Sequence, residues 1–426
     1  MSEIKSVSAR EILDSRGNPT VEVEVETASG VFGRASVPSG ASTGKAEALE
    51  LRDGDKGRYN GKGVLKAIDN VEEIIAPEII EMDVQDQCGI DQEMILLDGT
   101  SDKSRLGAKA MLGVSLACAR AASLELGLPL YRYLGGCNAK TLPVPLMNVF
   151  NGGLHSGARC AFQEFMLHSP RAESFSQALI RGRAVIAALR RILEERKWSV
   201  TLGDEGGFAP AELKGGTRAV LELLTEAIEK AHFTPGEEVS IAVDAAATSF
   251  FHDGVYDYGL FEEGGRQLTP AEQIGFLKEI TEAFPVDSIE DGLAEEEWSS
   301  WQELTRTLGG KCQLVGDDLF VTNSTRLRKG IQSGCANAIL LKPNQIGTLT
   351  ECCDTATLAR NAGFKAIMSH RSGETCDPFI ADLAVALGTG QIKAGSLARG
   401  ERVAKYNQLL RIEEQLGETA CYGISI

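Results

Sequence analysis

The chain has 426 residues, of which 43% are hydrophobic and 24% charged, the balance of a folded globular protein rather than a disordered one. A formal net charge of -17 disfavours nucleic acid and anionic lipid as partners over most of the surface. The sequence has no uncharged apolar run of 18 residues and begins without the apolar core of a signal peptide, so we expect a cytoplasmic protein without a membrane span. Ten scattered cysteines without a C-x-x-C pair are expected to be reduced thiols.

Residues 1–137 predict a small α+β domain. Residues 20–26 (TVEVEVE) and 31–37 (VFGRASV) alternate apolar and polar side chains around a Ser-Gly turn, which predicts an antiparallel hairpin. Apolar residues at spacings of three and four then predict helices over 63–80 and 107–127. Several helices are therefore expected to cover one sheet.

Residues 138–426 predict a second domain, which a glycine pair and two prolines separate from the first. Short apolar segments alternate here with long amphipathic helices such as 174–197, the pattern of a parallel sheet with crossover helices. The candidate strands, each with a polar residue near its carboxyl end, are 161–167 (AFQEFML), 199–205 (SVTLGDE), 239–245 (VSIAVDA), 286–292 (VDSIEDG), 313–319 (QLVGDDL), 337–344 (NAILLKPN), 365–372 (KAIMSHRS) and 391–396 (QIKAGS).

These segments predict the α/β class, with a C-terminal eight-stranded β/α (TIM-like) barrel after the smaller α+β domain. Such a barrel would bring the residues at the carboxyl ends of its strands to one face, where barrel enzymes place their chemistry. An open doubly wound sheet is the alternative, but no G-x-G-x-x-G motif follows the first strand. The strand-end residues are Glu164, Glu205, Asp244, Glu290, Asp317, Lys342, His370 and Lys393.

Several of these strand-end residues are carboxylates beside glycines, in the motifs GDEGG, SIEDG and VGDD. A single acid after a strand is usually a solvated loop residue, so the prediction depends on the set. Two like charges 4 Å apart repel by roughly 4 kcal/mol at an effective dielectric near 20, and a bound divalent metal would relieve this repulsion. A set of oxygen ligands favours Mg²⁺ over zinc. We predict Asp244, Glu290 and Asp317 as its ligands.

Two other residues are candidates for proton transfer. Glu205, flanked by glycines in GDEGG, is the natural general acid. Lys342 follows an apolar run, and burial is expected to lower its pKa toward the range in which a neutral amine acts as a base. A buried lysine at a strand end can also form a Schiff base, which keeps a second chemistry open.

A group of polar and basic residues predicts an anionic ligand. His370, Arg371 and Ser372 in SHRSGE suit a phosphate, because a guanidinium donates paired hydrogen bonds, and Lys393 adds another positive charge. His155 lies in a glycine-rich loop that could close over the ligand. The segment 38–48 (PSGASTGKAEA) lacks the spacing of a P-loop, but its small residues suit a lid whose Ser42 could reach a metal.

These motifs together resemble the enolases, the glycolytic 2-phosphoglycerate hydratases, from REILDSRGNPTVE (10–22) to KYNQLLRIEEQLG (405–417). The segments that carry the resemblance are PSGASTG, ELRDGD, NGGLH with QEF eight residues on, GDEGGFAP, SIEDGL, GDDLFVTN, LKPNQIGT, SHRSGET and GQIK. The resemblance covers nearly the whole chain. It implies the reversible dehydration of 2-phospho-D-glycerate to phosphoenolpyruvate, a lyase reaction.

The resemblance also implies roles for individual residues. Lys342 removes the C2 proton and Glu205 protonates the departing C3 hydroxyl, while Mg²⁺ held by Asp244, Glu290 and Asp317 stabilises the enediolate. The Ser42 loop brings a second Mg²⁺ against the phosphate. Substrate-binding residues complete the implied site: Arg371 and Ser372 at the phosphate, Lys393 at the carboxylate, and His155, Gln163, Glu164 and His370 around them. A homodimer or higher homo-oligomer is implied as well.

The chain departs from the family pattern at Lys109, Cys376 and Gly400, none of them a catalytic position. Three other functions remain as alternatives. The first is another superfamily member that acts on a different carboxylate, which Arg371, Ser372 and the Ser42 segment argue against because such substrates lack phosphate. The others are a Schiff-base aldolase that uses Lys342, and a binding or scaffold protein that keeps the fold without the chemistry.

Overall fold

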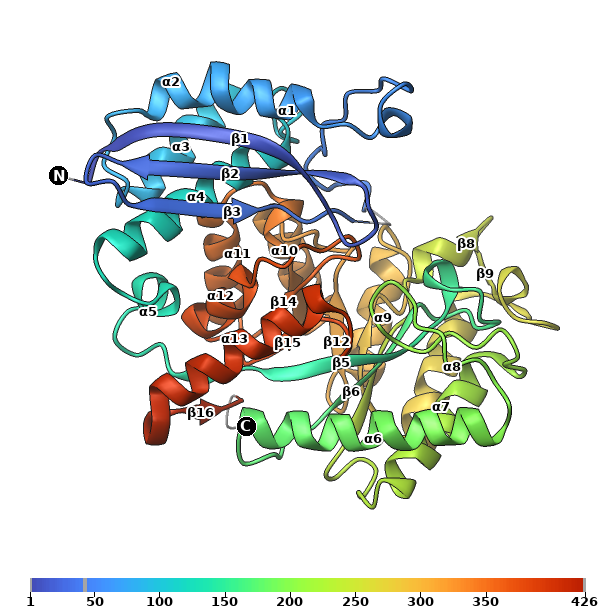
Figure 1. Ribbon diagram of the computed structural model, residues 1–426. Coiled ribbons are helices and arrows are strands. Elements are labelled where there is room, and N and C mark those ends of the chain that lie inside the picture. Colours follow the sequence, from blue (N-terminus) through green and yellow to red (C-terminus); the bar gives the residue numbers. More distant parts are fainter. Residues whose placement is uncertain (1, 41–43, 424–426) are drawn as a thin grey trace.

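The computed structural model describes residues 2–40 and 44–423 and has an N-terminal α+β part beside a C-terminal closed barrel (Figure 1). The N-terminal sheet is antiparallel, in the order β1 (Ile4–Leu13), β2 (Pro19–Thr27) and β3 (Phe32–Ser36). Strands β2 and β3 form the predicted hairpin. Strand β1 was not predicted, because its buried and exposed residues do not alternate regularly.

Helices cover one face of this sheet. The segment predicted over 63–80 is helical from α1 (Leu65–Asp69) through a π-helical turn to α2 (Ala76–Ile79). Helix α4, which packs on β2 and β3, approaches the sheet so closely that a Cβ on Gly33 would lie 2.2 Å from the Ala117 carbonyl oxygen. The remaining helices of this part are α3 (Gln87–Asp98), α4 (Ala108–Glu125) and α5 (Leu130–Gly135).

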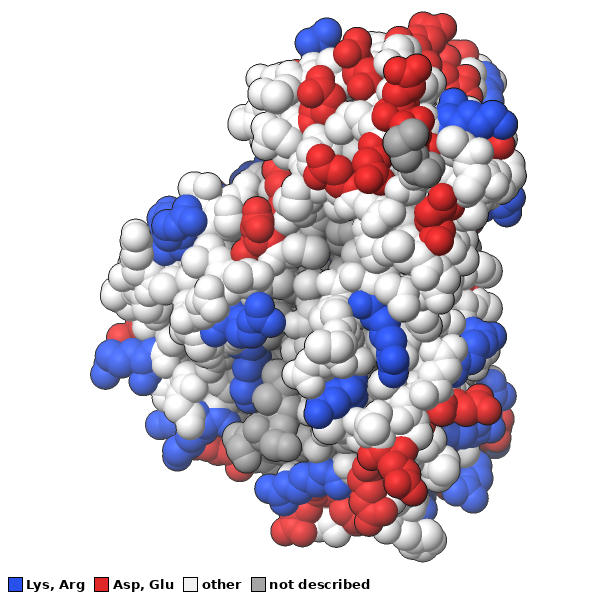
Figure 2. Space-filling model, turned by 90° about the vertical axis from the view of Figure 1, so that its left-hand side faces the viewer, with Lys and Arg blue, Asp and Glu red and all other residues white. Residues whose placement is uncertain are grey.

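Acidic side chains gather on the surface of the N-terminal part. On the face drawn in Figure 2 they crowd the top, at the height of α1 and α2 in Figure 1. Glu72, Glu73 and Glu78 are exposed there on one helical segment.

The C-terminal part is a closed eight-stranded barrel, which confirms the predicted fold class. Around the barrel the order is β11-β12-β13-β14-β15-β5-β6-β7. Its strands are β5 (Val144–Asn151), β6 (Glu164–His168), β7 (Ser240–Asp244), β11 (Val286–Glu290), β12 (Gln313–Gly316), β13 (Ala338–Leu341), β14 (Lys365–Ser369) and β15 (Gln391–Lys393).

Two details of the predicted barrel are wrong. Residues 199–205 form no strand: Leu202 makes only an isolated bridge to Phe208, and the glycine-rich GDEGG segment turns back on itself. The missing strand is β5, which is buried along its whole length but contains Pro145, a residue that argues against a strand in a sequence. The barrel is also not wholly parallel, because β6 runs antiparallel to both β5 and β7.

The reversal of β6 explains the position of Glu164. This residue begins β6, yet it pairs with Asn151 and Asp244 at the carboxyl ends of β5 and β7. An antiparallel strand brings its amino end to the edge where its neighbours have their carboxyl ends. Glu164 therefore faces the same end of the barrel as the other strand-end residues.

Helices surround the barrel and bury its outer face in one continuous apolar core. A smaller cluster of apolar side chains, including Leu146, Met166 and Leu340, fills the inside of the barrel. The helices are α6 (Phe175–Glu195), α7 (Gly216–Lys230), α8 (Pro270–Ala283), α9 (Trp298–Leu308), α10 (Ser324–Ser333), α11 (Leu349–Asn361), α12 (Phe379–Leu387) and α13 (Gly400–Leu416). The minor strands are β4 (Thr141–Leu142), β8 (Phe251–His252), β9 (Val255–Asp257), β10 (Gln267–Leu268) and β16 (Cys421–Tyr422).

The N-terminal part contacts the carboxyl end of the barrel through backbone and side chains. Ser39 and Gly373 exchange two backbone hydrogen bonds of 2.8 and 2.9 Å, and the Ser15 amide donates to the Glu374 carbonyl. Helices α3 and α4 pack against α11. Within the described part of the chain, no helix combines the length and the apolar character needed to cross a membrane.

Lys109, one of the departures from the family pattern, is fully buried in α4. Its ammonium group donates to Ser39 Oγ at 2.5 Å and lies 3.4 Å from Glu50 Oε2. Burial lowers its pKa to about 8, against the opposing charge of Glu50. The unfolded chain, where the lysine titrates normally, therefore binds more protons than the folded chain above pH 8.

We expect the stability of the protein to rise with pH relative to that of a Lys109→Met variant. The difference in free energy of unfolding should grow by up to about 3 kcal/mol between pH 8 and 10.5, because a shift of one pKa unit corresponds to about 1.4 kcal/mol. Urea denaturation of both proteins at a series of pH values measures it. A difference in stability that stays constant across that range would contradict the lowered pKa of Lys109.

Candidate active site

A cavity of about 430 Å³ lies at the carboxyl end of the barrel. Of the predicted site residues, it is lined by His155, Gln163, Glu164, Glu205, Asp244, Asp317, Lys342, His370, Arg371, Ser372 and Lys393. Glu290 joins this set through Lys393, whose Nζ lies 2.9 Å from Glu290 Oε1. Ser42 lies outside the described residues. The structure thus brings together, at one place, all the predicted site residues that it describes.

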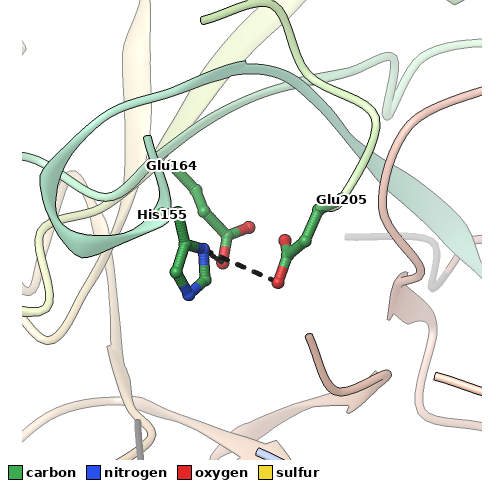
Figure 3. A group of neighbouring side chains, drawn as sticks. All are labelled: His155, Glu164 and Glu205. Carbon is green, nitrogen blue, oxygen red and sulfur yellow. Dashed lines mark ion pairs between the residues drawn. The ribbon is translucent and has the colours of Figure 1, made fainter. Parts of the chain in front are cut away.

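One side of the cavity holds two buried carboxylates and a histidine, Glu164, Glu205 and His155 (Figure 3). Asn148 Nδ2 donates to both carboxylates, at 3.1 Å to each. His155 Nδ1 lies 3.7 Å from Glu205 Oε1 and 3.9 Å from Glu164 Oε1. Neither ring nitrogen of His155 has a hydrogen-bond partner among the described residues.

The carboxylates of Glu164 and Glu205 have pKa values shifted in opposite directions. Burial alone would raise the pKa of Glu205, but its interaction with His370 lowers that pKa well below its ordinary value. Burial, the charge of Glu205 and a hydrogen bond between the two side chains raise the pKa of Glu164 well above its ordinary value. Two like charges so close together in a buried site cannot both be ionised at low cost. Within the pair, Glu164 therefore holds the proton and Glu205 is the ionised member.

His370 approaches Glu205 from the other side, with Nε2 3.5 Å from Glu205 Oε2. Its Nδ1 contacts the guanidinium of Arg402. Burial lowers the pKa of His370 to about 3, and the positive charge of Arg402 adds to this effect against the pull of Glu205. The imidazole is therefore neutral at physiological pH.

Lys393 lies among the acidic residues of the cavity and links Glu164 to Asp244 and Glu290. Its Nζ is 3.0 Å from Asp244 Oδ2, 2.9 Å from Glu290 Oε1 and 3.2 Å from Glu164 Oε1. Burial alone would lower the pKa of Lys393, but these carboxylates raise it well above its ordinary value. Lys393 is thus a permanent buried cation.

The contacts of Lys342 contradict the expectation that its pKa is lowered. Its ammonium group contacts Asp317 Oδ2, and Gln345 Nε2 donates to Asp317 Oδ1 at 2.9 Å. Burial alone would lower the pKa of Lys342, as predicted, but the Asp317 carboxylate outweighs burial and raises it. Neutralisation of Asp317 is therefore what would release this lysine as a base.

The donor set fits a hard divalent cation. Of the three predicted ligands, Glu290 has a pKa raised well above its ordinary value by burial and the charge of Asp244, whereas Lys342 outweighs burial and lowers the pKa of Asp317. All of them offer carboxylate oxygens, which Mg²⁺ prefers. The groups of described residues whose ligand atoms lie within 4.8 Å of one another are Asp291, Asp317 and Asp318, and His155, Glu164 and Glu205.

Arg371 lines the cavity next to the N-terminal part and is bound by a residue from it. Its Nη1 and Nη2 donate to the two oxygens of Glu47 at 2.9 and 3.2 Å, and Nη1 also donates to Asn344 Oδ1. The neighbouring Ser372 is buried, and its carbonyl accepts from Arg402. The guanidinium of Arg371 is thereby fixed at the edge of the cavity.

Several residues of the site were not singled out from the sequence. Asp291 and Asp318 directly follow predicted ligands, and Gln345 follows Lys342 in LKPNQIG, so proximity could have indicated them. Asn148 lies in the strand that was missed. Glu47 lies in the segment 38–48 predicted as a lid, although its contact with Arg371 was not foreseen. Arg402 gave no local signal, because only the packing of distant segments brings it to His370.

The chain was compared with models of known protein families. The model described as "Enolase, N-terminal domain" matches residues 4–134, and the model described as "Enolase, C-terminal TIM barrel domain" matches residues 139–425. The two matches cover nearly the whole chain and correspond to the α+β part and to the barrel. The chain therefore belongs to the enolase family.

Proposed function

We propose that the protein is an enolase, which catalyses the reversible dehydration of 2-phospho-D-glycerate to phosphoenolpyruvate in glycolysis and gluconeogenesis. Family membership supports a lyase of the enolase type. The observation that carries the finer proposal is one cavity that holds a lysine, a protonated Glu164 hydrogen-bonded to Glu205, and fixed cations for two anionic groups. These are the groups that removal of a proton beside a carboxylate and loss of a hydroxyl require.

In the proposed reaction, Lys342 Nζ takes the proton from C2 and Glu205 gives a proton to the C3 hydroxyl. The C3–O bond breaks, water leaves, and the electron pair from C2 forms the double bond. Lys342 and Glu205 belong to separate clusters in the cavity, the first with Asp317 and the second with His155 and His370. One substrate between them could meet a base and an acid at adjacent carbons.

The remaining residues would bind and orient the substrate. Lys393 is placed to contact the substrate carboxylate, and Arg371, Ser372 and His370 form the proposed phosphate site. For the phosphate to bind Arg371, it must compete with Glu47 for the guanidinium. Gln163, Glu164 and His155 would complete the pocket and exclude water from it.

Asp244, Glu290 and Asp317 would hold one Mg²⁺, and Ser42 belongs to the segment proposed to bring a second ion to the phosphate. When bound, Mg²⁺ supplies positive charge, which stabilises the second negative charge on the substrate carboxylate and offsets that of Asp317 beside Lys342. The crowding of carboxylates around Glu290 supports this assignment.

We propose further that the protein is a cytoplasmic homo-oligomer, a dimer or a larger ring, as membership of the family supports. Residues 1–137 and 138–426 are proposed as its domains, because α5 ends at Gly135 and β4 begins at Thr141. Sedimentation velocity would measure the oligomeric state.

The proposed function is tested with 2-phosphoglycerate and Mg²⁺ in a spectrophotometric assay. We expect ultraviolet absorbance to rise as the enol product forms, to stop rising when EDTA is added, and to resume with excess Mg²⁺. No rise with purified protein would favour another superfamily reaction. Trapping of a carbonyl substrate by borohydride, with indifference to EDTA, would instead indicate a Schiff base at Lys342.

A further inference from the structure

Arg402 is a fully buried arginine that reaches the candidate active site from the first turn of α13. Its Nη1 contacts His370 Nδ1 and donates to the Arg371 carbonyl at 2.5 Å. Its Nη2 donates to the carbonyls of Ser372 at 2.6 Å and Asp204 at 3.2 Å. One side chain thus holds the segment after β14 against the loop that carries Glu205.

The surrounding backbone packs closely against the Arg402 side chain. Gly395, at a positive φ of 80°, lies so close that a Cβ there would be 2.7 Å from Arg402 Cδ. The next residue, Ser396, donates its amide to the Glu205 carbonyl at 2.8 Å. The position of Arg402 is therefore linked to that of Glu205 through glycine packing as well as hydrogen bonds.

The contact between Arg402 and His370 decides where the imidazole carries its proton. A guanidinium stays protonated in proteins and offers only donors, so the ring nitrogen that faces it must be the acceptor. In a neutral imidazole the other nitrogen then carries the hydrogen. That nitrogen, Nε2, lies 3.5 Å from Glu205 Oε2 and has no other partner among the described residues.

We propose that Arg402 is a positioning residue, which fixes His370 as the tautomer with its proton on Nε2 and so directs an N–H group at Glu205. The consequence for the reaction, which rests on the proposed function, is that His370 orients Glu205 without taking its proton. A second proton on Nδ1 would place an imidazolium against a guanidinium. The acidic proton therefore remains with Glu164 and Glu205.

The tautomer can be measured directly, because the chain has only five histidines. Nitrogen NMR of protein labelled with ¹⁵N-histidine distinguishes a ring nitrogen that carries hydrogen from one that does not, and a His370→Asn variant assigns the signal. We expect hydrogen on Nε2 and none on Nδ1 in the unsubstituted protein between pH 6 and 8. Hydrogen on Nδ1, or an imidazolium, would overturn the proposal.

Substitution of Arg402 tests whether this residue fixes the tautomer of His370. In Arg402→Met we expect His370 to lose its single tautomer, and kcat for 2-phosphoglycerate to fall by at least about 10-fold with a smaller change in KM. Loss of the partner that fixes a catalytic imidazole costs up to about 10⁴-fold in kcat elsewhere. Arg402→Lys keeps a charged donor and should retain the Nε2–H tautomer, which also covers the case in which Arg402→Met fails to fold.

Lys405→Met is the matched control, since Lys405 is a fully buried cation one turn further along α13. It donates to Glu374 Oε2 at 2.7 Å and to the Thr375 carbonyl, in the same segment, without contacting His370. We expect this variant to lose stability and to keep the His370 tautomer. If His370 keeps the same tautomer in Arg402→Met, Arg402 has only a structural role and the proposal is wrong. The tautomer is read without substrate, so this outcome is distinct from failure of the proposed function.

Discussion

Replacing Lys342 by alanine is expected to abolish exchange of the C2 proton of 2-phosphoglycerate with solvent and to lower kcat by about 10² to 10⁴-fold. The lysine is mostly enclosed, with 12% of its side chain exposed, and its ammonium group contacts Asp317 at the edge of the cavity. Alanine removes the only atom assigned to take the C2 proton. Proton NMR of the substrate in deuterated buffer with Mg²⁺ measures the exchange as loss of the C2 signal.

Glu205→Gln is the matched partner of this experiment. Glutamine keeps the shape of the side chain beside Asn148 and His370 but cannot donate the acidic proton. We expect C2 exchange to continue while phosphoenolpyruvate formation stops. If both variants lose exchange to the same extent, the assignment of Lys342 as base and Glu205 as acid is wrong.

A second large effect is expected on stability when Lys393 is replaced by methionine. The change leaves Asp244, Glu290 and Glu164 buried without the cation that all three contact. Breaking a buried ion pair typically costs about 3 to 5 kcal/mol. We expect the free energy of unfolding, measured by urea denaturation at pH 8 in EDTA, to fall by about that amount.

The loss should depend on pH and on Mg²⁺. Loss of the lysine should raise the pKa values of Glu164 and Glu290 further above those of the unfolded chain, so we expect the variant to be more stable, relative to the unsubstituted protein, at pH 5 than at pH 8. Added Mg²⁺ should restore more stability to Lys393→Met than to the unsubstituted protein. A loss that is constant with pH would contradict the buried cluster.

Lys103→Met provides the control for this experiment. Lys103 is also nearly buried, but it pairs with one carboxylate, Glu351, at 3.0 Å, and that partner is partly exposed. We expect a smaller loss of stability, because water can solvate Glu351 when its partner is removed. Added Mg²⁺ should not restore the stability lost in Lys103→Met.

The fold could be predicted from local patterns where burial follows a regular period. The hairpin of β2 and β3 and helix α6 have such patterns, and they formed as expected. Strand β5 could not be predicted because its proline is accommodated by pairing with β15, a neighbour in the barrel that is far away in the sequence. The reversal of β6 depends on the same long-range closure of the barrel, which the spacing of sequence motifs does not reveal.

The candidate site could be predicted to the level of residue identity, because glycine-flanked acids and basic residues at strand ends are visible in the sequence. The protonation states of these residues could not be predicted from the sequence. The pKa of Lys342 is raised rather than lowered, since Asp317, 25 positions earlier, contacts its ammonium group. The charge state of a buried group depends on its neighbours in space, and these are set only when the strands assemble.

The pairing of β15 with β5 has a consequence for the synthesis of the chain. Strand β15 has three residues, Gln391–Lys393, and it bonds to Val144–Leu146, almost 250 residues earlier. During translation β5 and β14 must remain open edges until nearly all of the protein has been made. Open edges invite pairing with other chains. A ribosome that stalls before residue 391 would therefore release a product prone to aggregate, although most of its helices and strands are already encoded.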